Sequence, residues 1–138
     1  MKNTLNIKQF YKELGRLLYA VAMADKKIQK KEVKALHEFV ARELALSEPS
    51  SDSSGMNQAF YADFEFDEYT NKNISIKEAH DSFMKFLDAN IIEIGPKLIE
   101  KSIQAIEKVA GSFRKVNKKE RMMIDKIKAE IEKIADLF

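Results

Sequence analysis

The sequence predicts an all-α fold, a helical bundle of about six to seven helices that forms one domain over residues 1–138. Three observations predict this fold class. Apolar residues recur at intervals of three and four along most of the chain, no convincing pair of strands is present, and there are only four glycines and two prolines. Apolar residues make up 45% of the chain, which is too many for a disordered protein.

Two amphipathic helices are expected at the start of the chain. The first begins after Asn6, a suitable N-cap with Gln9 as its capping-box partner. Its apolar stripe consists of Ile7, Phe10, Leu14, Leu17, Leu18 and Val21. The second helix covers residues 29–46, and the serine-rich residues 47–57 predict a flexible surface loop.

An aromatic-rich segment follows this loop at residues 59–69. Phe60 and Phe64 have helical spacing, whereas Phe64 and Phe66 alternate as in a strand, and we predict a short helix. Its aromatic side chains could line a pocket or fill the core, and the core is the more common place for them.

Three more helices are expected after the aromatic segment. Residues 75–78 form a capping box, and the Gly95–Pro96 pair breaks the chain and starts another helix, since proline suits the first helical position. Residues 117–120 form a further capping box, after which the last helix runs to Phe138.

The two ends of the chain resemble each other at an offset of 88 positions. Residues 22–32 align with residues 110–120, and both segments have a helix, a short turn, an apolar residue and a second helix. The matched pairs are Ala22 and Ala110, Lys27 and Lys115, Ile28 and Val116, Lys31 and Lys119, and Glu32 and Glu120. This repeat predicts two pseudo-symmetric helical hairpins, although any two amphipathic hairpins share some of these features.

Residues 17–32, with the sequence LLYAVAMADKKIQKKE, resemble the signature of the TerB-like family, which includes tellurite-resistance proteins and a domain of DnaJ-like co-chaperones. The resemblance covers roughly residues 7–46 and 98–138. It implies an interaction protein of the bacterial stress response. Two positions depart from the family pattern, since Lys26 stands where a glycine is usual and Phe113 stands where the second copy would have an aspartate.

Three acidic residues are candidate ligands for a divalent cation. Asp25 ends the first helix, and Glu32 and Glu120 lie in the first turns of later helices. Together with carbonyl and water oxygens they could hold calcium or magnesium. Carboxylates in a first helical turn are also explained as caps that interact with exposed N–H groups. Residues 67–78 follow part of an EF-hand order, but position 3 is Tyr69 and position 6 is Lys72.

Basic residues crowd the two predicted turns, whereas residues 59–71 are acidic and contain no lysine or arginine. The predicted partner-binding residues are Lys26, Lys27, Lys30, Lys31, Arg114, Lys115, Lys118 and Lys119. They could bind an acidic protein or an anionic membrane surface, or they could simply form a solvated surface. No aromatic residues lie among the lysines to stack on bases, so we expect no specific binding of nucleic acid.

Enzyme chemistry has little support in the sequence. The chain has no cysteine, and His37 and His80 each stand alone on a predicted helix. We therefore predict an interaction module that is not an enzyme, with a small enzyme in the aromatic segment as the alternative. The N-terminal residues lack the apolar stretch of a signal peptide, and we expect a cytoplasmic protein.

Overall fold

The computed structural model describes residues 5–25, 28, 30–48, 51, 55–110 and 118–136; within these ranges the side chains of Asp25, Glu32, Lys119 and Glu120 are not described. The described residues are almost all helical. The helices are α1 (Ile7–Ala22), α2 (Lys30–Phe39), α3 (Ala45–Ser47), α4 (Phe60–Lys72), α5 (Ile76–Ala110) and α6 (Lys118–Asp136).

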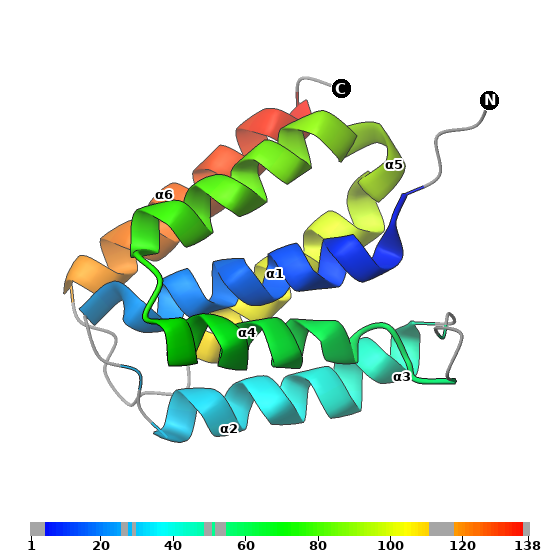
Figure 1. Cartoon of the computed structure of the whole chain (residues 1–138). Helices are drawn as coiled ribbons and strands as arrows, with labels where there is room; N and C mark the ends of the chain where they lie inside the picture. The colour runs from blue at the N-terminus through cyan, green and yellow to red at the C-terminus, as the bar shows by residue number, and fades with distance from the viewer. Residues whose placement is uncertain are drawn as a thin grey trace.

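Helix α1 is the central element of the bundle, and the other helices surround it (Figure 1). It packs mainly against α4 and α5. Asn6 caps its start as expected, because the Asn6 side chain accepts a hydrogen bond from the backbone N–H of Gln9 at 3.0 Å. From Phe10 to Ala22 nearly every residue of α1 is buried, and these residues form the middle of a single hydrophobic core.

Helix α2 continues through a π-helical segment, Val40–Leu44, into the short α3. The chain then returns as α4, which lies between α1 and α2 in Figure 1. Helix α4 is followed by the C-cap Asn73, whose φ of 53° and ψ of 48° are left-handed. Asparagine tolerates this conformation better than most residues, so it terminates the helix.

Helix α5 is kinked near its middle. Asn90 and Gly95 have non-helical backbone angles, and Gly95 is followed by Pro96. Gly95 has a φ of 73°, which glycine adopts without the steric cost that a Cβ atom would add. The part of α5 that follows this kink therefore turns back behind α1, and α6 packs along α5 (Figure 1).

The predicted all-helical class is confirmed, because the described residues contain helices and no strand. The predicted helix at residues 59–69 and the break at Gly95–Pro96 correspond to α4 and to the kink of α5. The expected six to seven helices and the pseudo-symmetric hairpins are not confirmed. Five of the described helices have ten or more residues, and α1 packs on α4 and α5 more than on α2.

The predicted flexible loop at 47–57 has anchored residues among those that are described. Glu48 is buried, and its carboxylate accepts a hydrogen bond from the Tyr11 hydroxyl at 2.8 Å. The side-chain amide of Asn57 donates hydrogen bonds to the carbonyl oxygens of Ala45 and Glu48.

None of the described helices is both long enough and apolar enough to cross a lipid bilayer.

Candidate functional site

The three predicted cation ligands lie at helix ends. Asp25 ends the 3-10 turn after α1, and Glu32 and Glu120 lie in the first turns of α2 and α6. Their side chains are outside the described part of the structure, so the cation site stays a prediction. Among the side chains that are described, no group of three or more His, Cys, Asp or Glu is placed to hold a metal ion.

The alternative calcium loop at residues 67–78 is wrong. Residues 67–72 are helical and form the end of α4, followed by the left-handed cap Asn73. The Ser75 hydroxyl accepts a hydrogen bond from the backbone N–H of Glu78 at 3.1 Å. This segment therefore ends one helix and caps the next, and it does not wrap around a cation.

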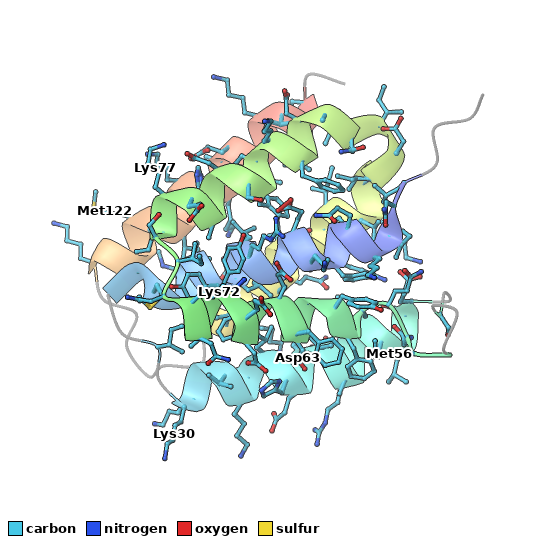
Figure 2. All side chains as sticks on the ribbon, in the orientation of Figure 1. Lys30, Met56, Asp63, Lys72, Lys77 and Met122 are labelled. Atoms are coloured by element: carbon cyan, nitrogen blue, oxygen red, sulfur yellow. The ribbon has the colours of Figure 1, made fainter. Side chains whose placement is uncertain are left out.

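The described basic residues of the two predicted turns lie at one end of the bundle, which we call the basic end. It consists of Lys30, Lys31 and Lys34 on α2 and Lys118 on α6, all exposed. The starts of α2 and α6 lie at the same end in Figure 1, and α6 contacts the turn that follows α1. Figure 2 shows Lys30 extending away from the bundle.

For the remaining predicted basic residues, only their positions in the sequence are known. Lys26, Lys27, Arg114 and Lys115 are outside the described residues, and Lys119 lies in α6 without a described side chain. Residues 26–34 contain five lysines against one glutamate, and residues 114–121 contain five lysines or arginines against one glutamate. The net charge of the whole chain is only +2, so the positive charge is concentrated in these segments.

The lysines of the basic end form no ion pair with any other described residue. Elsewhere on the surface, Lys72, Lys77 and Lys128 pair with neighbouring carboxylates at 2.8, 2.5 and 2.6 Å. The basic end also adds the positive ends of two helix dipoles, because both α2 and α6 begin there.

A groove of about 460 Å³ begins at the basic end, and we call it the α2–α4 groove. Ile28 and Val33 give it an apolar floor. Polar side chains surround this floor, namely Lys30, Lys34, His37 and Glu38 from the α2 side and Thr70 from α4.

His37 is held against α4 by Asp63. The Nδ1 atom of His37 lies 2.6 Å from Oδ1 of Asp63, and Figure 2 shows Asp63 between α4 and α2. Burial raises the pKa of the Asp63 carboxyl, and the hydrogen bond from His37 opposes this rise. The His37 side chain remains 44% exposed. A histidine that stands alone in the sequence is thus paired with Asp63 in the structure, and it lines the α2–α4 groove.

A second polar cluster, the buried charge network, joins α1, α4 and α5. It consists of Glu13, Arg16, Glu65 and Ser82. Nε of Arg16 donates to Glu65 at 2.9 Å, and Nη1 donates to the Ser82 hydroxyl at 3.0 Å. The Ser82 hydroxyl in turn donates to Glu13 at 2.5 Å. Every buried side-chain nitrogen or oxygen that is described has a hydrogen-bond partner, so this network is internally satisfied.

The aromatic segment mainly fills the core. Phe66 and Phe83 are buried, and Tyr19 of α1 makes edge-to-face contacts with Phe66 and Tyr69 at 6.3 and 5.8 Å. The guanidinium of Arg16 lies 5.2 Å from the centre of the Tyr69 ring. Phe64 is 51% exposed and is therefore not part of the buried core.

A wider cleft lies at the kink of α5, and its volume is about 690 Å³. Its lining is mostly apolar, with Glu100 and Gln104 as polar exceptions, and Ile92 of this lining is 72% exposed. The apolar lining residues are Ile91, Ile92, Pro96, Ile99, Ile103 and Ala135.

Comparisons of this chain with protein-family models, with curated proteins and with solved structures gave no match. The resemblance of residues 17–32 to the TerB-like family therefore stays a prediction.

Proposed function

We propose that this chain is a helical interaction module that binds an acidic protein partner through its basic end. One observation carries the proposal. Lys30, Lys31 and Lys34 lie within the first two turns of α2, are exposed, and have no ion-pair partner among the described residues. A cluster of like charges without partners creates a positive potential, which attracts an acidic surface and steers it during association.

The buried polar groups favour binding over catalysis. The carboxylates of Glu13 and Glu65 are already occupied by Arg16 and Ser82, and the network lines none of the grooves described above. A catalytic acid or base must reach a substrate within hydrogen-bond distance. These carboxylates instead serve to join α1 with α4 and α5.

Charge reversal at the basic end tests the proposal. The full chain is titrated with a glutamate-rich peptide at low and at physiological ionic strength, and binding is followed by calorimetry. The variant K30E/K31E/K34E should lose binding. Wild-type affinity should fall as salt is added, because charges at a surface are screened beyond about 8 Å at 0.15 M ionic strength.

The matched control is K85E/K97E/K133E, which changes the net charge by the same amount at three other exposed lysines. If both triple variants lose binding equally, the interaction depends on total charge and the basic end is not its site. Anionic vesicles serve as a second probe. Salt-sensitive binding to vesicles but not to the peptide would replace the acidic protein partner with a membrane surface.

The family resemblance supports the further proposal that the partner acts in the bacterial stress response, including resistance to tellurite. Capture of the products of neighbouring genes by the immobilised full chain tests this part. Captured proteins should have acidic surfaces and should be released by salt. Capture that is equally strong with K30E/K31E/K34E would count against the basic end as the contact.

A further inference from the structure

The α2–α4 groove combines an apolar floor with basic side chains and with a histidine that is held in one orientation. Lys30 and Lys34 are four residues apart, so they project from the same side of α2. The floor formed by Ile28 and Val33 suits an apolar side chain. The flanking ammonium groups suit carboxylates on the same ligand.

The orientation of His37 determines which ring nitrogen a ligand can meet. Asp63 occupies Nδ1, so Nε2 is the nitrogen that remains for a ligand in the groove. When the imidazole is protonated, Nε2–H donates to a carboxylate in a charge-assisted hydrogen bond. When the imidazole is neutral and Nδ1 carries the proton, Nε2 has no hydrogen to donate.

We propose that the α2–α4 groove binds an acidic peptide segment with an apolar side chain, and that His37 makes this binding tighter as the pH falls. The apolar side chain lies on Ile28 and Val33, and carboxylates of the peptide meet Lys30, Lys34 and Nε2 of His37. This inference rests on the proposed function, because it names the groove beside the basic end as the binding site of the acidic partner.

Several other charges face His37 and modify this contact. On α2 itself these are Lys34 and Glu38, one positive and one negative. From α4 it is Asp63, and the negative charge of Asp67 helps to raise the pKa of Asp63.

Helix α5 packs against another side of α2. Its Lys108 lines a separate groove together with Glu38 and does not line the α2–α4 groove. Carboxylates thus outnumber lysines among these groups, and a bound carboxylate adds a contact that depends on the charge of the imidazole.

The pH range from 8 to 6 isolates the contribution of histidine. Lysine side chains stay protonated and peptide carboxylates stay ionised throughout this range, whereas histidine changes its charge. We expect wild-type affinity to be about three- to tenfold higher at pH 6 than at pH 8.

The experiment titrates the full chain with a synthetic peptide of alternating glutamate and leucine residues at both pH values and at constant low ionic strength. His37→Gln should bind with the same affinity at pH 6 and pH 8. His80→Gln is the matched control, since both ring nitrogens of His80 already contact carboxylates, of Asp81 and Glu130. It should keep the wild-type pH dependence.

A second measurement needs no variant. The ring resonances of the two histidines are followed by NMR as peptide is added to the wild-type chain. Those of His37 should shift together with the backbone amide of Val33, and those of His80 should not. This keeps the proposal testable even if His37→Gln fails to fold.

The outcomes separate the inference from the proposed function. If K30E/K31E/K34E loses peptide binding but the pH dependence persists in His37→Gln, the role of His37 is wrong and the basic end still stands. If a peptide of glutamate alone binds as tightly as the alternating peptide, the apolar floor contributes nothing to the affinity and the groove is not the peptide-binding site. If reversing the lysines has no effect at either pH, the proposed function itself fails.

Discussion

Replacing Gly15 with alanine tests the close contact between α1 and α4. Gly15 is buried, and a Cβ atom on it would lie 2.3 Å from the carbonyl oxygen of Ala62 and 3.0 Å from its Cα. The oxygen and Cα belong to the backbone of α4, so no change of side-chain rotamer relieves the overlap. The two helices would have to separate by roughly 1 Å to restore an ordinary contact distance.

Two opposing effects determine the free energy of unfolding of this variant. Alanine is favoured over glycine inside a helix by about 1 kcal/mol, so helix propensity alone would stabilise Gly15→Ala. Overpacking a dense core costs about 1–3 kcal/mol, and an overlap with rigid backbone belongs at the upper end of this range. We therefore expect a net loss of about 2 kcal/mol.

Urea unfolding followed by circular dichroism measures the change. The midpoint of Gly15→Ala should fall by about 1 M at an unchanged slope. The exposed helical position Ala129 provides the control, because Ala129→Gly reports helix propensity alone and should lose about 1 kcal/mol. A higher midpoint for Gly15→Ala would refute the reasoning, because it would mean that propensity outweighs the contact and that α1 and α4 do not approach this closely.

Three further predictions follow from the structure. Arg16→Met leaves two carboxylates of the buried charge network without their cation, and it should lower the free energy of unfolding by about 2–3 kcal/mol at pH 8. An unchanged free energy of unfolding of Arg16→Met in urea titrations would contradict this account. Because burial raises the pKa of Asp63, its protonation contributes stability that is present below about pH 4 and is lost as the pH rises through the raised value. As the pH rises from 3 to 5.5, the wild-type free energy of unfolding should therefore fall relative to that of Asp63→Asn. A difference that stays constant over this range would contradict a raised pKa of the Asp63 carboxyl. Millimolar calcium should leave the NMR amide resonances of residues 67–78 unchanged, because these residues form a helix end and a helix cap. A localised shift would indicate that these residues bind calcium.

Local patterns determined much of the secondary structure. The apolar stripe and the cap at Asn6 predicted α1, because hydrophobic periodicity and side-chain capping depend on residues three or four positions apart. The same reasoning placed the start of α5 at Ser75 and its kink at Gly95–Pro96. It did not determine which helices pack together, and the expected pair of symmetric hairpins is not confirmed for that reason.

The candidate site depends on pairs of residues that are distant in the sequence. His37 meets Asp63 at a separation of 26 residues, and Arg16 meets Glu65 at a separation of 49. The acidic residues of α4 were visible in the sequence, but the helix face that each one shares with a neighbour was not. A weak signal existed in the opposite charges of the two segments that became α2 and α4.

The sequence by itself determined a helical chain, the positions of most helix ends, and two segments rich in positive charge. Only the tertiary structure decided that the starts of α2 and α6 lie at one end of the bundle, and that a groove with His37 begins there. The physical reason is that caps and apolar stripes act within one or two turns of a helix. Grooves and buried ion pairs, by contrast, arise where the faces of different helices meet, and close contacts such as Gly15 on Ala62 set how near those faces come.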